Sequence, residues 1–260
     1  MAPPPQRQLL SQVARLFPDA LFYAPTDEKL VALSIDDIPT PGEQDDRSTR
    51  LILQAIATHN RTTDHPARAT FFVITDHLTL GSTILQEILA EGHEIANHGT
   101  SDTTPAILQP VEFERHFREA HDIITNLIQQ PLRWYRPGRG LYNRSMLEQV
   151  RLLPGYESLL ALASMIPFDT FRTLDDPALT TWYLSRFIFP GAIFVMHGGS
   201  EDRCRQTAKA LPELLQILDH QGYRVVTLSE LYDRVIAETA PGQRPPHPAQ
   251  PQGSPSPPPA

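Results

Sequence analysis

The chain has 260 residues, a formal net charge of -8, and a composition that is 40% hydrophobic and 20% charged. This length fits one sizeable domain, and a sequence without a basic block or stripe argues against nucleic acid as a partner. The single cysteine, Cys204, excludes an internal disulfide and suits a reducing compartment. No apolar run approaches the roughly 18 residues that span a membrane, and we see no secretory signal, so we expect a cytoplasmic protein with no membrane partner.

Short apolar runs alternate with amphipathic stretches along the chain. The apolar runs predict strands over 30–36, 68–74, 93–98, 132–136, 159–165, 192–197 and 223–228. The amphipathic stretches predict helices over 48–60, 82–92, 111–129, 144–153, 180–188, 207–222 and 229–238. Ser82 is the expected N-cap and Gly92 the expected stop of the second helix, and Pro212 is expected to weaken or delay the start of its own helix. The alternation predicts an α/β fold, either a barrel or an open doubly wound sheet.

The two ends differ in composition from the middle. Residues 241–260 are almost all Pro, Gln, Gly, Ser and Ala, which bury too little apolar surface to offset the entropy of ordering, so we expect disorder there. We expect residues 1–29 to be an N-terminal extension and residues 30–240 to form one folded domain.

Polar side chains collect where the predicted strands stop. The first strand ends at Asp36 and Asp37, the third at His98, the fourth at Arg136 and the sixth at His197. In both candidate architectures, ligands bind at the carboxyl ends of the strands. These residues therefore predict one shared site.

A divalent metal ion accounts for this set of residues. His98 and Asp102 stand at positions i and i+4, a spacing that lets both face one point from a helical turn, and Asp37 can add a third ligand. Histidine and carboxylate ligands suit zinc with an open position for water. The alternative is that Asp102 caps the segment that follows and that His98 is a hydrogen-bonded core histidine.

The adjacent carboxylates Asp36 and Asp37 are expected to have different roles. Successive side chains of a strand point to opposite faces, so the two aspartates cannot point the same way. One can bind the metal ion while the other takes a proton from a water molecule that the ion activates.

Several motifs resemble those of the polysaccharide deacetylase family, which includes chitin deacetylases. "SIDDIP" resembles the family's T-F-D-D-G-P signature, "EIANHGTSD" its H-[ST]-x-x-H motif, "WYRPGRG" its R-P-P-x-G motif and "FVMHGG" its terminal L-x-L-H strand. "ATFFVI" and "GYRVVTLSEL" are similar to the family's second and last strands. The resemblance covers residues 30 to about 235, in the family's order. It implies a distorted (β/α) barrel of about seven strand-helix units and metal-dependent removal of an N-acetyl group from a chitin-like amino sugar.

The resemblance also implies residue roles. Asp37, His98 and Asp102 would hold the metal ion, with zinc as the first expectation and manganese or cobalt as alternatives. Asp36 would be the general base, and Arg136 would pair with it and orient it.

The resemblance assigns the second proton transfer, to the leaving group, to His197. By resemblance it would be the general acid that protonates the departing amine, and Asp169 would orient it. Asp175 and Asp176 are alternatives for that orienting carboxylate. The resemblance also places a backbone N–H donor for the oxyanion at or near Arg139.

The chain departs from the family's pattern at three places. Asp102 replaces a histidine, which makes the site more anionic and favours ions that prefer oxygen ligands. Ile38 replaces a glycine, and we expect it to narrow the groove beside the base. In the arginine motif, Gly138 replaces a proline and Arg139 an aromatic residue, and a cation there favours an anionic or polar substrate.

Two other functions stay open. One is an intracellular hydrolase of a small cyclic amide or ureide, and the other is an inactive relative that binds a ligand.

Among the remaining histidines, we expect His77 to be solvated and His93 to make a structural hydrogen bond.

Overall fold

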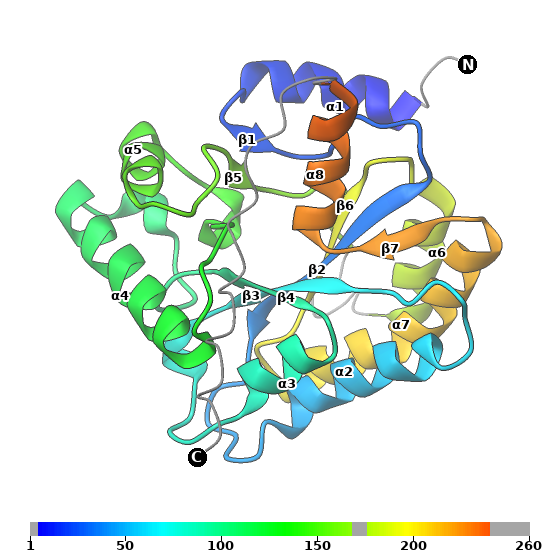
Figure 1. Cartoon of the computed structure of the whole chain (residues 1–260), viewed down its shortest axis with the longest axis horizontal. Helices are drawn as coiled ribbons and strands as arrows, with labels where there is room; N and C mark the ends of the chain where they lie inside the picture. Colours follow the sequence, from blue (N-terminus) through cyan, green and yellow to red (C-terminus); the bar gives the residue numbers. More distant parts are fainter. Residues whose placement is uncertain (1–4, 168–175, 240–260) are drawn as a thin grey trace, which may run out of the picture.

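A parallel sheet forms the centre of the computed structural model, which describes residues 5–167 and 176–239 (Figure 1). Its strands run in the order β4 (Glu94–Asn97), β3 (Ala69–Val73), β2 (Leu30–Ile38), β6 (Ile193–His197), and β7 (Arg224–Val226) pairs with the first half of β2. All nine residues of β2 are buried, as expected for a strand covered on both faces.

Isolated backbone bridges and hydrogen bonds from coil segments extend this sheet into a closed barrel. Tyr135 bridges to Asn97 at the edge of β4, and its carbonyl accepts a hydrogen bond from Ala161 N at 3.0 Å. Ala161 belongs to β5 (Leu160–Ala161), which pairs with β1 (Ala20–Leu21). A bridge between Met165 and Phe194 then returns the chain to β6. The predicted barrel is confirmed, with irregular coil in place of two regular strands.

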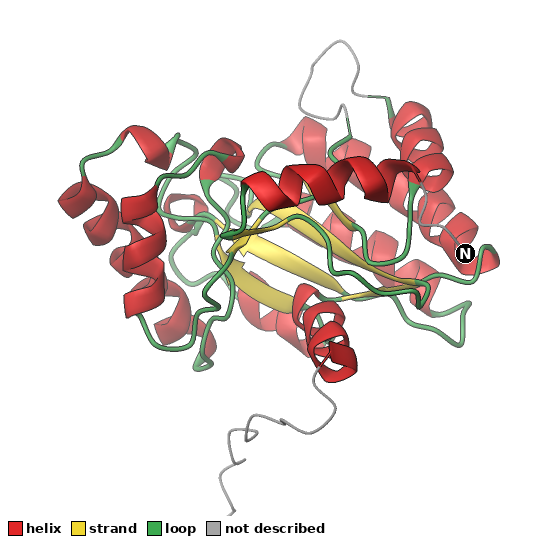
Figure 2. Cartoon of the chain, turned by 90° about the horizontal axis from the view of Figure 1, so that it is seen from above, coloured by secondary structure: helices red, strands yellow, loops and turns green. Residues whose placement is uncertain are grey.

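The helices form a ring around the strands (Figure 2). Along the ring each helix packs against the next, in the order α6 (Pro177–Phe187), α7 (Glu201–His220), α2 (Arg47–Asn60), α3 (Ile84–Ala90), α4 (Pro110–Ile128), α5 (Arg144–Leu152). Helices α1 (Pro5–Leu16) and α8 (Leu228–Thr239) are not part of this series; in Figure 1, α1 lies along the top of the molecule and α8 runs from the strands toward it. Short 3-10 turns, η1 (Thr75–His77), η2 (Pro105–Ile107) and η3 (Gly138–Gly140), follow β3, β4 and the Tyr135 bridge.

Some of the predicted elements are wrong. Residues 132–136 form no strand, and only Leu160–Ala161 of the predicted 159–165 does, because these coil segments close the barrel through isolated bridges. Ser82 precedes the N-cap Thr83, although its hydroxyl accepts a hydrogen bond from Ile84 N. Gly92 is the helix stop that was predicted, with a φ of 81° that favours glycine.

Helix α7 begins earlier than Pro212 suggested. Ser200 caps the helix by accepting a hydrogen bond from Arg203 N, and Glu201 and Asp202 place negative charge in its first turn. Pro212 therefore lies inside a 20-residue helix. The apolar stripe that α7 buries, which includes Leu211 and Leu214, outweighs the hydrogen bond that the proline removes.

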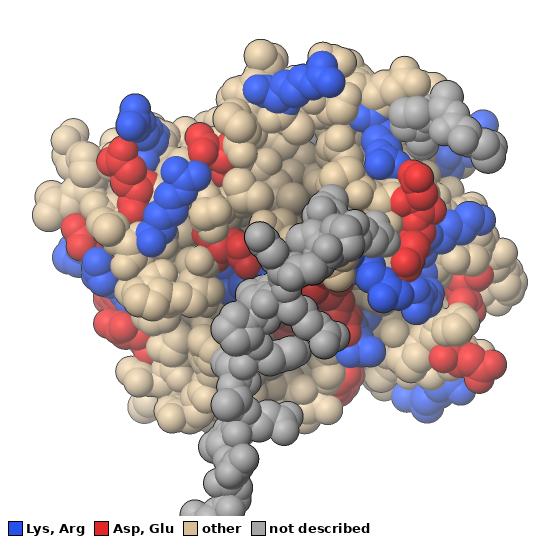
Figure 3. All heavy atoms as spheres, turned by 45° about the horizontal axis from the view of Figure 1, so that its top comes forward, with Lys and Arg blue, Asp and Glu red and all other residues tan. Residues whose placement is uncertain are grey.

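The surface carries charges of both signs. On the face shown in Figure 3, Lys and Arg side chains lie among Asp and Glu side chains, and no patch of one sign gathers there. Within residues 5–167 and 176–239, no helix is long and apolar enough to cross a membrane. The predicted tail, 241–260, lies outside the described residues.

His93 makes the predicted structural hydrogen bond at the start of β4. Its Nδ1 accepts from Ala69 N at 3.2 Å, and its ring lies 5.3 Å from that of Phe71. Burial, together with the smaller effect of the positive charge of Arg68, lowers the pKa of His93 from 6.5 to about 4. The folded protein therefore keeps this imidazole neutral.

We expect His93 to make the fold sensitive to acid. Between pH 6.5 and about 4 the unfolded chain binds a proton at this position and the folded chain does not, so the free energy of unfolding falls as the pH falls through this range. The loss attributable to His93 should reach up to about 3 kcal/mol. Urea unfolding at pH 7, 6, 5 and 4 measures it. The His93→Gln variant should lose less stability over the same range, and equal losses would contradict the prediction.

Candidate active site

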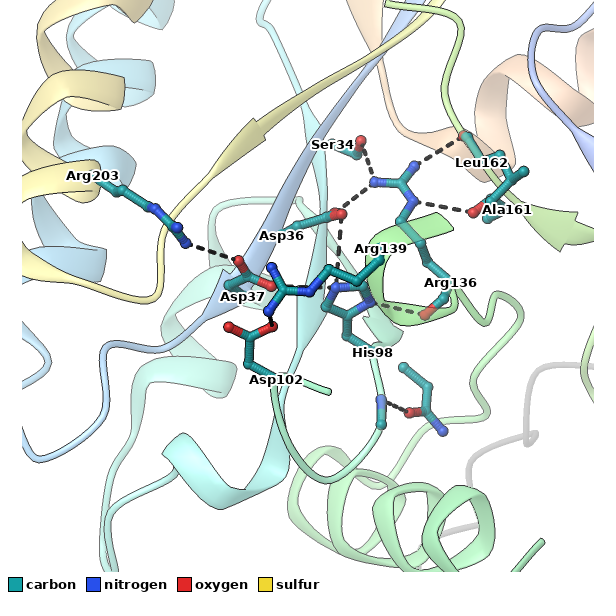
Figure 4. Close-up of polar contacts among 12 residues, drawn as sticks. Ser34, Asp36, Asp37, His98, Asp102, Arg136, Arg139, Ala161, Leu162 and Arg203 are labelled. Atoms are coloured by element: carbon teal, nitrogen blue, oxygen red, sulfur yellow. Dashed lines mark hydrogen bonds and ion pairs between the residues drawn. The ribbon is translucent and has the colours of Figure 1, made fainter. Parts of the chain in front are cut away.

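A cavity of about 420 Å³ lies at the carboxyl ends of β2, β4 and β6, where the sequence predicted a site. Its polar lining consists of Asp36, Asp37, His98, Asp102, Arg136, Arg139, His197 and Arg203. Its apolar lining includes Phe22, Leu162, Ile166 and Val195. Figure 4 shows the carboxylates and His98 grouped between arginines that reach in from different elements.

A larger hollow of about 500 Å³ lies between the end of α1 and α5. Its acidic residues Asp19 and Glu148 form exposed ion pairs with Arg151 and Arg144. Of the residues that the structure describes, no histidine lines this hollow and no group of catalytic side chains converges there. We therefore place the chemistry in the smaller cavity.

Arg136 and Asp36 form a buried ion pair. Arg136 Nη1 donates to Asp36 Oδ1 at 2.5 Å and to Ser34 Oγ at 2.8 Å. Arg136 is 4% exposed and Asp36 is 5% exposed. Nε and Nη2 donate to the carbonyls of Ala161 and Leu162, both at 3.1 Å. Nearly every donor of the guanidinium is used, and this satisfies the requirement for burying a charge. The carboxylate of Asp36 is thereby held in one orientation at the cavity wall.

Asp37 faces the same point as Asp36, contrary to the expectation from strand alternation. Its φ of 66° lies in the left-handed region, and the register of β2 against β3 shifts between Ile35 and Ile38. This local break turns the Asp37 side chain toward the cavity, and an aspartate tolerates the left-handed conformation better than most residues. Both carboxylates consequently reach His98.

His98 lies between the two aspartates. Its Nδ1–H donates to the carbonyl of Arg136 at 2.8 Å, and its Nε2 lies 3.3 Å from Asp37 Oδ1 and 3.8 Å from Asp36 Oδ2. Burial by itself lowers the pKa of His98, but Asp36, Asp37 and the Arg136 carbonyl favour the charged ring, and the pKa is raised. Holding Nδ1 on a carbonyl leaves Nε2 to face the cavity, which is how metal-binding histidines are usually oriented.

The same contacts act on Asp37. Burial by itself raises the pKa of this carboxyl group, but the hydrogen bond and charge of His98, with the charges of His197 and Arg203, lower it from 3.8 to about 2. Asp37 is therefore an anion throughout the neutral range.

Asp102 lines the cavity but is paired with an arginine. Residues 98–102 form no helical turn, so the i and i+4 argument for a shared direction is wrong. Asp102 Oδ1 instead lies 2.8 Å from Arg139 Nη2, and the two side chains are 43% and 55% exposed. Asp102 makes no capping hydrogen bond either, and the N-cap of η2 is Thr104.

His197 lies at the end of β6 as predicted. It is the register partner of Asp36 across the two strands and lines the cavity with it. Its backbone carbonyl accepts a hydrogen bond from Thr207 Oγ1 at 2.8 Å. Asp169 and Asp175 lie outside the described residues, and Asp176 is the N-cap of α6, accepting from Ala178 N at 2.9 Å.

Two residues that contact Asp37 were missed by the sequence reasoning. Arg203, in the first turn of α7, places Nη1 3.3 Å from Asp37 Oδ2. His77, expected to be solvated, places Nδ1 3.1 Å from the carbonyl of Asp37 and 2.9 Å from that of Pro39. The available signal was position, because both follow closely after a strand that ends at the site.

Ile38 does not narrow the groove as expected. Its side chain is fully buried in the core, and a Cβ added at Gly198 would lie 2.7 Å from its Cγ2. At Gly199, where φ is 73°, a Cβ would lie 2.7 Å from Asp37 Cβ. The two glycines after His197 are thus needed because Asp37 and Ile38 lie against their backbone.

The residues satisfy part of the requirement for a divalent metal ion. Asp37 and His98 present an anionic oxygen and an oriented imidazole nitrogen 3.3 Å apart, a donor pair suited to zinc or a similar ion. Asp102 can join them only by leaving Arg139. Accordingly, among residues 5–167 and 176–239, no group of three or more His, Cys, Asp or Glu side chains is placed to hold a metal.

The family is settled by a comparison of sequences. The sequence profile of the family described as "Polysaccharide deacetylase" matches residues 23–157, just over half of the chain. The chain belongs to the polysaccharide deacetylase family. The resemblance seen in the motifs is confirmed, and so is the enzyme class that it implied, a hydrolase of the deacetylase type.

Curated relatives agree with this assignment. The chain is 28% identical over 207 residues to a peptidoglycan-N-acetylglucosamine deacetylase of Bacillus cereus, covering 80% of this chain and 90% of the relative. It is also 28% identical to a chitooligosaccharide deacetylase of a Bradyrhizobium strain, covering 65% of this chain and 80% of the relative.

Solved structures share the fold. A CE4 family pseudoenzyme from Bacillus anthracis superposes with a TM-score of 0.68 at 22% identity, covering 83% of this chain and 69% of that one. A family 4 acetyl xylan esterase from Clostridium thermocellum, described in complex with a cobalt ion, superposes with a TM-score of 0.67 at 23% identity, covering 79% and 91%. At this identity the likeness concerns the fold alone.

We expect the Arg136→Gln variant to be strongly destabilised. Removing the guanidinium leaves the Asp36 carboxylate buried without its counter-ion, a change that typically costs about 3–5 kcal/mol. Urea unfolding at pH 7 measures the free energy of unfolding. The control is Arg144→Gln, which removes an exposed ion pair and should cost at most about 0.5 kcal/mol. Losses of the same size in both variants would show that the buried pair is not needed for stability.

Proposed function

We propose that this chain removes the acetyl group from the nitrogen of an N-acetylated amino sugar, with Asp36 as general base and His197 as general acid. The observation that carries the proposal is the fixed carboxylate of Asp36, held by Arg136 at the wall of a cavity that His197 also lines. A carbohydrate substrate follows from the family, and the N-acetylglucosamine unit follows from the names of the relatives.

Hydrolysis of an N-acetyl group requires an attacking water and a proton for the nitrogen that leaves. We assign the removal of the water's proton to Asp36, whose pairing with Arg136 keeps one oxygen occupied and leaves Oδ2 toward His98 and the cavity. We assign proton donation to His197, which closes the same cavity from the neighbouring strand β6. Water and the amide are thereby converted into acetate and a free amine.

We further propose Asp37, His98 and Asp102 as the residues that would hold a divalent ion, zinc first, and manganese or cobalt as alternatives. Deacetylases of this family depend on a divalent ion. When bound, such an ion supplies a Lewis acid that polarises the acetyl carbonyl. What supports the assignment is the Nε2 of His98, which lies at the cavity beside an ionised Asp37. Asp102 lines the same cavity and would have to exchange Arg139 for the ion.

The neighbourhood of Arg139 also supports the expected oxyanion donor. Arg139 has a φ of 61° within η3 and lines the cavity together with Gly140. Backbone N–H groups of a short turn at a cavity wall can bind a developing negative charge on the acetyl oxygen. The orienting carboxylate of His197 stays a prediction for Asp169.

We expect the Asp36→Asn variant to lose about 10²- to 10⁴-fold in kcat, because an amide cannot take the proton from water. Acetate release from N-acetylglucosamine oligosaccharides, with zinc, manganese or cobalt added in turn, measures it. The control is Asp64→Asn, which changes an exposed carboxylate in the loop between α2 and β3.

Retention of the fold in both variants is checked by circular dichroism. Acetate release by Asp36→Asn at the rate of the control would contradict the role of Asp36. Release of ammonia or a ring-opened product from a cyclic amide, with no acetate from the sugars, would contradict the proposed substrate.

A further inference from the structure

Each of the three carboxylates in the active-site cavity is paired with its own arginine. Asp36 is paired with Arg136, Asp37 with Arg203 and Asp102 with Arg139 (Figure 4). The three negative and three positive charges of these pairs cancel, before any charge on His98 or His197 is counted. A cavity that must hold a divalent cation is expected to carry excess negative charge, so this balance calls for an explanation.

The pair between Arg136 and Asp36 differs from the other two. It is buried, and its guanidinium is bound on several sides, so it is a permanent part of the barrel. Arg203 and Arg139, whose side chains are 30% and 55% exposed, each reach their aspartate through a single terminal nitrogen. Exposed side chains held by one contact can move away at low cost.

The fold places Arg203 beside Asp37. Ser200 caps α7 and binds Arg203 N at 3.3 Å, which fixes the backbone of the first helical turn. Gly199 lies against Asp37, and a Cβ added at Gly199 would be only 3.0 Å from the Asp37 carbonyl oxygen. The helix therefore begins in contact with the strand end, and its third residue extends over the carboxylate.

Arg139 is placed beside Asp102 by an equally close backbone contact. A Cβ added at Gly138 would lie 2.2 Å from the carbonyl oxygen of Thr103, so only glycine allows the two segments to approach this closely. Arg139 directly follows Gly138, and Asp102 directly precedes Thr103, so this close approach brings the two members of the ion pair together. The departures from the family's pattern at 102, 138 and 139 are thus parts of one contact.

We propose that Arg139 and Arg203 compete with a divalent metal ion for Asp102 and Asp37, and so lower the affinity of the site for that ion. This inference rests on the proposed ligands Asp37, His98 and Asp102. Arginine stays charged at all accessible pH values. Arg139 occupies Asp102 Oδ1 and Arg203 occupies Asp37 Oδ2, so each withdraws a carboxylate oxygen from a bound dication unless it moves away. Each guanidinium that stays within a few ångströms repels the ion.

The test is the affinity of the metal-free protein for Mn²⁺ and Co²⁺, measured by isothermal titration calorimetry at one pH and ionic strength. We expect Arg139→Gln and Arg203→Gln each to bind both ions at least about tenfold more tightly than the unmodified chain. Arg139→Lys and Arg203→Lys keep the positive charge and should gain less. The control Arg144→Gln, an exposed arginine on α5, should leave the affinity unchanged.

An unchanged or weaker affinity in either glutamine variant overturns the proposal for that arginine. Equal gains in the lysine and glutamine variants would also overturn it, because the effect would then come from side-chain shape and not from charge. Thermal unfolding confirms that each variant folds, and any variant that does not is replaced by the corresponding methionine variant.

Failure of this inference can be told from failure of the proposed function. Acetate release at saturating metal tests the deacetylase reaction, and the titration tests only the arginines. Tighter metal binding without acetate release would support the competition and contradict the reaction. Acetate release with unchanged affinities would do the reverse.

Discussion

The guanidinium of Arg136 joins the parts of the barrel that the sheet leaves unconnected. The guanidinium donates to Asp36 and Ser34 in β2 and to the carbonyls of Ala161 and Leu162. The backbone carbonyl of Arg136 accepts a hydrogen bond from His98. The face of the guanidinium lies 4.0 Å from the ring centre of Phe72. A buried charge is tolerated only when its donors are satisfied, so losing one of these contacts weakens the others. The interaction that ties β2 to the 161–162 segment is also the one that orients the proposed base.

A second constraint acts on the backbone at the end of β2. The left-handed conformation of Asp37 turns two adjacent carboxylates toward one histidine, and His77 and Gly199 pack around that bend. The cost of the conformation is offset by the hydrogen bond and ion pair that the Asp37 side chain gains with His98 and Arg203. The site is thus built from an interruption of the strand and not from its regular alternation.

Positive charge balances the carboxylates throughout the cavity. Arg139 and Arg203 pair with the aspartates that a metal ion would use, and close glycine contacts at Gly138 and Gly199 place them there. This arrangement connects the departures in the arginine motif with the aspartate at position 102. It links the metal affinity of the site to the mobility of two exposed side chains.

The sequence by itself determined the α/β alternation, most of the helices and the rim at which Asp36, Asp37, His98, Arg136 and His197 collect, while the choice of a barrel over an open sheet came from the family resemblance. Hydrophobic periodicity is local, and the carboxyl ends of parallel strands lie on one side, so both could be predicted from the order of residues. The tertiary structure alone decided that both aspartates face His98, that Ile38 enters the core, and that Asp102 pairs with Arg139. Those outcomes depend on a left-handed residue and on contacts between segments distant in the chain, such as Gly138 with Thr103 and Gly199 with Asp37. Local sequence patterns cannot predict such contacts, because the space available at each backbone position is set by the segment packed against it.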